Sequence, residues 1–383
     1  MPVHIQSLRP RNLLSFGPDT EALALRELNV VIGPNGSGKS NLIEVLGLLA
    51  ATPRSVGDAL RAGGGLEEWS WKGDRKGTKP GLEALVQGAT PLRYELSARP
   101  HVMRPGLGEL EERLVHMSDA QQLYFGELNG LTHILHRESL RVVNSHDFNS
   151  TESVLSQRQD PEGYPEIFQL AGLLRSIRFY RDWTFGRTFP PRMPQPADLP
   201  NDYLMEDGRN LGLMLNRIRR SPEAKQSLLS YLRLIYDGIH DFDVSVQGGT
   251  VQVFLHENTW VIPSTRLSDG TLRWLSLLTV LLNPAPQSVV CIEEPEIGLH
   301  PDLMPSLAKL LREASERMQL VVTTHSDALV DALSSTPEAV LVCEKHQGST
   351  VMRRCTREEL SEWLGKYTLG QLWRRGELGG NRW

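Results

Sequence analysis

The chain carries the stretch Gly33-Pro34-Asn35-Gly36-Ser37-Gly38-Lys39-Ser40, which directly follows the apolar run 28–32. Three glycines let consecutive backbone N–H groups curve around a phosphate chain, and a helix that begins near Lys39 turns its positive end toward the same anion. The stretch therefore predicts a phosphate-binding loop, in which Lys39 reaches the β- and γ-phosphates of a nucleotide and Ser40 holds Mg²⁺. The alternative is a glycine-rich turn with a stray lysine. A β-branched run before the stretch and helical apolar spacing over 41–49 favour the loop.

A second stretch, Ser288-Val289-Val290-Cys291-Ile292-Glu293-Glu294-Pro295, predicts a buried strand that ends in two carboxylates. In a parallel α/β sheet, ligands bind outside the carboxyl ends of the strands, so both acids would reach the phosphate side. Neighbouring side chains on a strand point to opposite faces. We therefore expect Glu293 to hold Mg²⁺ through water and Glu294 to act on the attacking water. A pair of solvated acids at a strand end is the alternative, and the phosphate-binding loop argues against it.

Two more stretches belong with these motifs: Arg266-Leu267-Ser268-Asp269-Gly270-Thr271-Leu272-Arg273-Trp274 and Val321-Val322-Thr323-Thr324-His325-Ser326. Together the four stretches resemble an ABC-type ATPase head. They are most similar to the RecF/SMC-like branch of AAA-family ATPases found in DNA repair and prokaryotic antiphage systems. The resemblance covers residues 1–60 and 263–345. It implies an α/β fold, a P-loop NTPase head of the ABC type with an antiparallel β-subdomain and a helical insert, and it implies ATP hydrolysis with Mg²⁺.

The resemblance also implies roles for single residues. The active site of this family is shared between two heads, so we expect an ATP-dependent head-to-head dimer. Ser268 and the Gly270 amide would contact the γ-phosphate held by the partner's Lys39, at the positive end of the signature helix. His325 would be the switch histidine that contacts the γ-phosphate. Gln157 is the candidate for the glutamine that senses Mg²⁺ and the attacking water, and a solvated loop glutamine is the open alternative.

Three residues depart from the family pattern. Asp269 stands where many relatives carry glycine, Glu293 replaces the usual aspartate, and His300 falls where transporter heads carry an aspartate. These departures suit the RecF-like branch, and they leave the rate of hydrolysis open.

Composition excludes several classes of protein. The chain has 383 residues, of which 40% are hydrophobic and 23% charged, as in ordinary soluble proteins rather than disordered ones. No apolar run approaches the roughly 18 residues that a membrane helix needs, and the first residues do not resemble a secretion signal, so we predict a cytoplasmic protein without membrane contact. The three cysteines form no CxxC pair and are expected to be structural.

The net charge of −5 does not favour nucleic acid over the whole surface, so any DNA contact must be local. The best candidate is the run 175–183, in which Arg175, Arg178 and Arg181 interleave with aromatic residues. The alternative is a core strand whose aromatic side chains are buried and whose arginines are paired. The alternative is favoured.

We expect five segments along the chain. They are residues 1–65 (N-terminal part of the ATPase core with the phosphate-binding loop), 66–165 (antiparallel β-subdomain), 166–240 (linker and helical insert), 241–345 (C-terminal part of the core with the signature, the carboxylate strand and the switch histidine) and 346–383 (C-terminal extension). Residues 3–8 and 28–32 are expected to be the first sheet strands. Alternating runs at 92–97, 122–128 and 141–143 predict antiparallel hairpins.

The second half of the chain adds four expectations. The proline-rich run 189–196 is interpreted as a stiff linker. Helical spacing over 208–237 predicts the helical insert, and 243–255 predicts a hairpin. Residues 369–383 combine aromatic residues, arginines and glycines and are interpreted either as a docking tail for a partner or as a segment folded back on its own head.

Three classes of function remain. We favour an ATP-dependent regulator that controls a separate effector in DNA repair or antiphage defence. The middle of the chain has no sustained heptad repeat, so we expect no coiled-coil arms. Residues 346–383 are too few for an appended TOPRIM domain, so we expect no intrinsic nuclease. The effector would then be encoded separately, for example as a TOPRIM-like nuclease. The alternatives are the ATPase subunit of a transporter and a low-turnover structural clamp. Transporter heads place the signature much closer to the phosphate-binding loop than Ser268 lies from Lys39.

Overall fold

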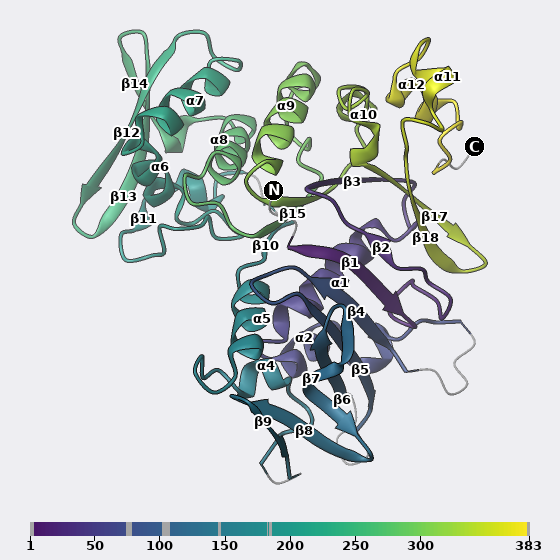
Figure 1. Cartoon of the computed structure of the whole chain (residues 1–383). Coiled ribbons are helices and arrows are strands. Elements are labelled where there is room, and N and C mark those ends of the chain that lie inside the picture. Colours follow the sequence, from purple (N-terminus) through teal and green to yellow (C-terminus); the bar gives the residue numbers. More distant parts are fainter. Residues whose placement is uncertain are drawn as a thin grey trace. The chain divides into compact units, whose positions relative to one another are not determined.

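The computed structural model describes residues 4–73, 79–101, 108–144, 147–181, 183 and 186–380. The chain divides into two compact units, whose elements can be followed in Figure 1. The N-terminal unit comprises residues 2–177, 338–355 and 376–383, and the central unit comprises residues 178–337 and 356–375. Within the described ranges, every helix is too short or too polar to cross a membrane.

An eight-stranded antiparallel sheet forms much of the N-terminal unit (Figure 1). In spatial order its strands are β2 (Leu23–Ala24), β1 (Ile5–Arg11), β4 (Gly81–Val86), β5 (Leu92–Pro100), β6 (Gly108–His116), β7 (Asp119–Leu128), β8 (Leu131–His136) and β9 (Ser139–Val142). Buried and half-buried residues alternate along β4 and β5, which is the pattern of a sheet with one packed face. The antiparallel hairpins expected in this part of the chain are confirmed.

A second, smaller set of strands in the same unit contains β3 (Leu28–Ile32), β17 (Val340–His346) and β18 (Ser349–Arg354). β3 runs parallel to β17, and β17 pairs antiparallel with β18. Every residue of β3 is buried, whereas β1 alternates between buried and accessible positions. The two expected first strands therefore join different sheets, because only β3 is apolar enough to be buried on both faces.

Five helices complete the N-terminal unit. They are α1 (Lys39–Ala51), α2 (Val56–Ala62), α3 (Leu66–Trp69), α4 (Val154–Gln157) and α5 (Pro165–Arg175). α1 packs against α2 and α5, and α4 packs against α5. The strand predicted before the phosphate-binding loop and the helix predicted after it are both present, as β3 and α1.

Parallel strands form the core of the central unit. β15 (Val289–Glu293) lies between β10 (Arg178–Tyr180) and β16 (Gln319–Thr323) and runs parallel to both. The same unit contains the helices α8 (Asp269–Leu281), α9 (Met304–Ser315), α10 (Asp327–Asp331), α11 (Ser361–Leu364) and α12 (Leu369–Arg374), of which α9 packs on β16. The predicted buried carboxylate strand is thus confirmed as β15.

An antiparallel sheet with two helices forms the rest of the central unit (Figure 1). Its strands are β11 (Gln195–Pro196), β12 (Ile239–Gln247), β13 (Thr250–Glu257) and β14 (Trp260–Pro263), with β13 pairing to the other three. α6 (Leu211–Arg219) packs on β12 and β13, and α7 (Pro222–Leu232) packs on α8 and β12. The hairpin expected over 243–255 and the helical insert expected over 208–237 are therefore both present.

Three short 3-10 helices lie between these elements, and a fourth precedes β17. They are η1 (Pro190–Arg192), η2 (Ser264–Arg266), η3 (Pro301–Leu303) and η4 (Pro337–Ala339).

The proline-rich run 189–196 is not a linker, which corrects the interpretation made from composition. Phe189 and Gln195 are buried, β11 pairs with β13, and the Gln195 side chain accepts a hydrogen bond of 2.7 Å from the Gly212 backbone N–H. Prolines at the edge of a sheet and at the start of a short helix are compatible with packed structure. The run is part of the central unit.

The C-terminal segment also has a defined place. Residues 369–374 form α12, which packs on α10 of the central unit, so this part of the predicted tail folds back on its own head. Residues 381–383 of the predicted tail lie outside the described residues.

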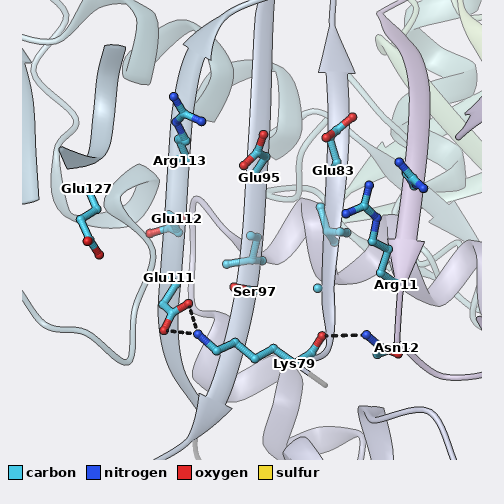
Figure 2. Close-up of a pocket in the computed structure, with 14 residues that line it drawn as sticks. Arg11, Asn12, Lys79, Glu83, Glu95, Ser97, Glu111, Glu112, Arg113 and Glu127 are labelled. Atoms are coloured by element: carbon cyan, nitrogen blue, oxygen red, sulfur yellow. Dashed lines mark hydrogen bonds and ion pairs between the residues drawn. The ribbon is translucent and has the colours of Figure 1, made fainter. Parts of the chain in front are cut away.

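A polar cavity of about 690 Å³ lies over the antiparallel sheet of the N-terminal unit (Figure 2). Lys79 and Glu111 form an ion pair at its lower edge. The neighbouring Glu112 accepts hydrogen bonds from the Tyr94 hydroxyl, from Ser153 Oγ at 2.5 Å and from the Val154 N–H at 2.8 Å. Glu112 thus connects β6 to the first residues of α4.

Burial raises the pKa of the Glu112 carboxyl, although the hydrogen bonds from Ser153, Tyr94 and Val154 act in the opposite direction. A carboxyl group with a raised pKa in the folded state contributes stability that is fully present below the pKa of the unfolded chain. This contribution is lost as the pH rises through the raised folded pKa.

We expect Glu112→Ala to lower the free energy of unfolding by about 1–3 kcal/mol, because the buried donors that it satisfies lose their acceptor. Glu111→Ala is the matched control. Its exposed ion pair with Lys79 predicts a change of less than about 1 kcal/mol. Urea unfolding measures the free energy of unfolding of the wild type and of both variants. The difference in this free energy between the wild type and Glu112→Ala should become smaller as the pH is raised from about 4.5. Equal losses for the two variants would contradict the assignment.

Candidate functional site

The phosphate-binding loop joins β3 to α1 through glycines in unusual backbone conformations. Gly33 has φ +151° and Gly38 has φ +113°. A Cβ atom at Gly33 would lie 2.2 Å from the Cys343 backbone oxygen, and one at Gly38 would lie 2.1 Å from Thr350 Oγ1. Both positions require glycine because the backbone there approaches β17 and β18 too closely for a side chain.

Lys39 is buried, and its side chain bends back over the loop. Its Nζ donates hydrogen bonds of 2.9 Å to the Gly33 oxygen and 3.0 Å to the Pro34 oxygen. The Ser37 hydroxyl is buried and has no hydrogen-bond partner among the described residues. A buried ammonium group, an unsatisfied hydroxyl and the N-terminus of α1, which begins at Lys39, are the groups that a triphosphate would engage. The loop therefore fits a nucleotide.

Two residues that contact the loop, Thr350 and Cys343, were not found from the sequence. Thr350 on β18 donates a hydrogen bond of 2.7 Å from its hydroxyl to the Ser37 backbone oxygen, and its N–H donates one of 2.7 Å to the Ser15 oxygen. Cys343 on β17 directs its thiol toward the same Ser37 oxygen at 3.4 Å, and burial raises its pKa to about 11, so it stays protonated. No sequence signal marks these residues, because they reach the loop only through the pairing of β3, β17 and β18.

In the central unit, β15 ends at Glu293, and Glu294 follows it in a left-handed conformation with φ +45°. This conformation is uncommon for a residue other than glycine and costs energy. Three hydrogen bonds to its backbone hold it: the Glu294 N–H donates to the Thr323 oxygen at 3.0 Å, and the Glu294 oxygen accepts from Arg273 Nη2 at 2.6 Å and from the Ile297 N–H at 3.2 Å. The two adjacent carboxylates have different neighbours. Glu293 Oε1 lies 3.6 Å from Arg181 Nε, whereas the Glu294 carboxylate lies beside a histidine.

His325 lies beside Glu294. Its Nε2 is 3.7 Å from Glu294 Oε1, and its backbone N–H donates a hydrogen bond of 2.8 Å to Glu296 Oε1. Thr324 Oγ1 donates to the same Glu296 oxygen at 2.7 Å. The structure therefore brings together two of the predicted residues, Glu294 and His325, and Glu296 holds the loop that carries the histidine.

Arg273 was also not found from the sequence. It lies on α8, is almost fully buried, and stacks over the Trp183 ring at 4.8 Å. Burial lowers its pKa to about 10, while Glu296 and Glu294 act in the opposite direction, so it stays protonated at neutral pH. In the sequence it is one of several polar residues in a helix rich in leucine, and only the fold shows that it supports Glu294.

The residues predicted to form the signature lie at the N-terminus of α8. Ser268 is the N-cap residue and accepts a hydrogen bond of 3.1 Å from the Thr271 N–H. A Cβ atom at Gly270 would lie 2.7 Å from the Gly298 backbone oxygen, so only glycine fits there. A cleft of about 450 Å³ opens at this point, and its lining residues include Ser268, Gly270, Thr271, Leu299, His300 and Asp302. Asp269 instead pairs with Arg192 at 2.5 Å.

The remaining predicted residues have local partners. The Gln157 side chain, at the end of α4, hydrogen-bonds to the backbone of Asn149 and Glu152 at 2.9–3.0 Å, so in this structure it holds the preceding loop. Its role near Mg²⁺ stays a prediction. Phe179 and Tyr180 are buried, and the Arg178 guanidinium stacks on the Tyr203 ring at 3.9 Å. This matches the alternative of a core strand with paired arginines.

The predicted residues are divided between the two units. The phosphate-binding loop and Gln157 lie in the N-terminal unit, and Ser268, Gly270, Glu293, Glu294 and His325 lie in the central unit.

The sequence profile of one protein family matches most of the chain, over residues 28–113 and 137–331. The family is described as "AAA domain, putative AbiEii toxin, Type IV TA system". No curated protein matches the chain.

Solved structures of SMC head domains are similar in fold. An Smc head bound to the C-winged helix domain of ScpA matches with a TM-score of 0.53 and 13% identity, covering 93% of this chain and 99% of that one. An Smc head domain with an extended coiled coil, bound to the C-terminal domain of ScpA derived from Pyrococcus furiosus, matches with a TM-score of 0.51 and 11% identity, covering 95% and 99%. The predicted fold class, a P-loop NTPase head of the ABC type, is confirmed.

Proposed function

Because the chain belongs to this AAA-domain family, as an SMC/RecF-like ATPase head of the ABC type, we propose that it hydrolyses ATP in a head-to-head dimer that regulates a separate effector. The observation that carries the proposal is the turn at Glu294, where a backbone conformation of high energy is held by Arg273 and the side chain lies beside His325. Costly conformations of this kind are typical of catalytic sites.

The phosphate-binding loop supplies the nucleotide site of this proposal. The amides of residues 35–40 and the Lys39 ammonium group would bind the phosphates, and Ser40 and Glu293 would hold Mg²⁺, with Gln157 as a further candidate. Mg²⁺ would neutralise phosphate charge and orient the terminal phosphate. The buried, unsatisfied Ser37 hydroxyl and the bent Lys39 side chain support this assignment.

Hydrolysis is assigned to Glu294, which follows β15, and to His325, which follows β16. Glu294 accepts a proton from the attacking water, and His325 contacts the γ-phosphate. Arg273 donates to the Glu294 backbone oxygen rather than to its carboxylate, so its contribution is to fix the turn. Glu296 fixes the loop of His325 through two hydrogen bonds.

The dimer is proposed from the cleft at the N-terminus of α8. Ser268 and Gly270 line this cleft together with His300, and the helix N-terminus favours an anion. We assign the cleft to the terminal phosphate that the partner head holds. Closure of two heads around ATP would then couple the nucleotide to the shape of the dimer.

The proposed effector is a separate protein chain that the head dimer binds. The two similar SMC heads are each bound to a domain of ScpA, which supports a head that carries a partner protein. The family description names a toxin of a toxin–antitoxin system, which supports a role in prokaryotic defence. A separately encoded TOPRIM-like nuclease, in the cytoplasm, is the effector that we propose. DNA contact through Arg175, Arg178 and Arg181 is not included, because each of these arginines has partners within the protein.

We expect Lys39→Ala to weaken ATP binding by roughly 10- to 100-fold, because each charge-assisted hydrogen bond to a phosphate contributes about 1.5–3 kcal/mol. Calorimetry with a non-hydrolysable ATP analogue and Mg²⁺ measures the change. Lys72→Ala is the matched control, since Lys72 is an exposed lysine of the same unit paired with Glu68. An unchanged affinity of the Lys39→Ala protein would overturn the nucleotide site.

We expect Glu294→Gln to retain ATP and to slow hydrolysis by roughly 10²-fold or more, as loss of a general base does. The substitution preserves the turn, because the hydrogen bonds that hold it involve the backbone of Glu294. Light scattering should show this variant as a dimer with ATP and a monomer without it. Ser268→Arg should stay monomeric, whereas Ser230→Arg, on the exposed side of α7, should behave as the wild type. One mass for all variants, with and without ATP, would refute the dimer.

The effector is tested by co-expression with the products of neighbouring genes. The Glu294→Gln variant should retain the effector in a pulldown in an ATP-dependent way, and Ser268→Arg should lose that dependence, because the retained complex depends on head closure. Nuclease activity of this chain alone, or a stable complex with a membrane permease, would contradict the regulator proposal.

A further inference from the structure

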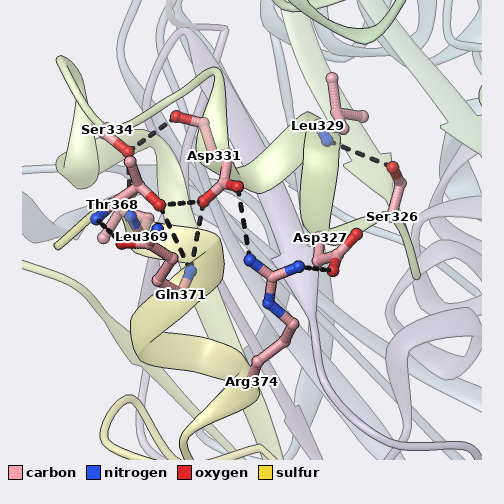
Figure 3. Close-up of polar contacts among 9 residues, drawn as sticks. All are labelled: Ser326, Asp327, Leu329, Asp331, Ser334, Thr368, Leu369, Gln371 and Arg374. Carbon is pink, nitrogen blue, oxygen red and sulfur yellow. Dashed lines mark hydrogen bonds and ion pairs between the residues drawn. The ribbon is translucent and has the colours of Figure 1, made fainter. Parts of the chain in front are cut away.

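The C-terminal helix α12 is bound to α10 by a cluster of polar contacts (Figure 3). The Asp331 carboxylate, at the end of α10, accepts hydrogen bonds from the Thr368 hydroxyl and from the Gln371 N–H at 3.2 Å. Arg374 reaches the other end of α10, where its Nη1 lies 2.7 Å from Asp327 Oδ2. The Leu369 N–H donates a hydrogen bond of 2.9 Å to Ser334 Oγ. The contacts therefore hold both ends of α10.

The backbones of α10 and α12 approach so closely at Gly370 that no side chain fits between them. A Cβ atom at Gly370 would lie 2.4 Å from the Asp327 backbone oxygen and 2.4 Å from Asp331 Oδ1. Leu369 and Leu372 are fully buried, and α12 begins with a capping box formed by Thr368 and Gln371. We call residues 368–374 the strap. Its apolar side chains and its polar contacts make it an integral part of the central unit.

The helix that contacts the strap is α10, and the loop with His325 directly precedes it. We call residues 324–326 the switch loop. α10 begins at Asp327, two residues after His325, and Ser326 is its N-cap. The opposite side of the loop is fixed by Glu296, which accepts hydrogen bonds from Thr324 and from the His325 N–H. The loop of His325 is therefore held between Glu296 on one side and a helix clamped by the strap on the other.

We propose that the strap positions His325 for ATP hydrolysis, with Arg374 and Gly370 as positioning residues. Neither residue belongs to the proposed nucleotide site. Arg374 fixes Asp327 at the first turn of α10, and Gly370 permits the close approach that keeps α10 in place. The inference rests on the proposed ATPase function. It adds a set of contacts through which a change at the C-terminal segment would reach the catalytic histidine.

The expected effects follow from the exposure of these contacts. The ion pair between Arg374 and Asp327 is half-exposed. Loss of such a pair changes the equilibrium between the held and the released position of a helix by up to about fivefold. Arg374→Ala should therefore lower kcat by roughly two- to fivefold. Gly370→Ala should lower kcat more, because its Cβ atom would displace the backbone of α10 or of α12. The KM for ATP should change little in both variants, since the phosphate-binding loop is untouched.

Arg375→Ala is the matched control. Arg375 is the next residue in the chain, is exposed, and stacks over Tyr367 rather than contacting α10. Arg374→Lys keeps the positive charge but not the forked geometry, so it should restore part of the lost activity. The double variant Asp327→Asn/Arg374→Ala should be no slower than the slower of its single variants, because both remove the same contact.

Two measurements on the full chain test the proposal. Steady-state kinetics gives kcat and KM for each variant, and amide hydrogen exchange reports the opening of residues 324–331 without requiring turnover. We expect faster exchange in this segment for Arg374→Ala and Gly370→Ala, and wild-type exchange for Arg375→Ala. If amide exchange of residues 324–331 is unchanged in Arg374→Ala and Gly370→Ala, the proposed role of the strap is wrong even if the protein hydrolyses ATP.

The outcomes distinguish the proposed ATPase function from the proposed role of the strap. If exchange increases as expected but kcat equals that of Arg375→Ala, the strap holds α10 without positioning His325, and the proposal is wrong. If kcat, ATP affinity and melting temperature fall together, the contact is only structural. A wild type whose basal hydrolysis is not reduced by Glu294→Gln would instead reject the proposed function, and the exchange result would still decide whether the strap controls the switch loop.

Discussion

The phosphate-binding loop depends on a close approach of backbones that leaves no space for side chains at Gly33 and Gly38. The atoms that occupy this space are the Cys343 oxygen and the Thr350 hydroxyl, which come from strands about 300 residues later in the chain. Because Thr350 also satisfies the Ser37 oxygen, protein atoms hold the loop in its shape. Preorganised amides of this kind bind an anion without the cost of ordering a flexible loop.

A similar principle governs the end of β15. Glu294 adopts a left-handed conformation that no local propensity favours, and it keeps this conformation because Thr323 and Arg273 bind its backbone. Arg273 remains charged in an almost fully buried position because it stacks on Trp183 and lies near Glu294 and Glu296. The strain at Glu294 is therefore supported by a helix and an aromatic ring that are distant in sequence.

The central unit also shows how positions outside the motifs can influence them. His325 is held by Glu296 on one side, and the helix that follows it is held by Asp331, Thr368 and Arg374 on the other. A segment whose composition left open a docking tail or a segment folded back on its own head is therefore bound to the helix that follows His325. The interpretation of 189–196 as a linker failed for a related reason. Proline content describes backbone stiffness, whereas Phe189 and Gln195 decide whether the segment is buried.

Local sequence determined the elements whose physics is local. The stretch 33–40 specifies a loop between a buried strand and a helix, the run 288–295 specifies a buried strand ending in two acids, and alternation specifies the antiparallel hairpins. Only the tertiary structure decided which sheet β1 joins, that Glu294 lies beside His325, and that Thr350, Arg273 and Arg374 support the motifs. These residues carry no signal of their own, because a hydroxyl or a guanidinium group acquires its role from the partner that the fold places next to it, and that partner is set by strand pairing and helix packing over hundreds of residues.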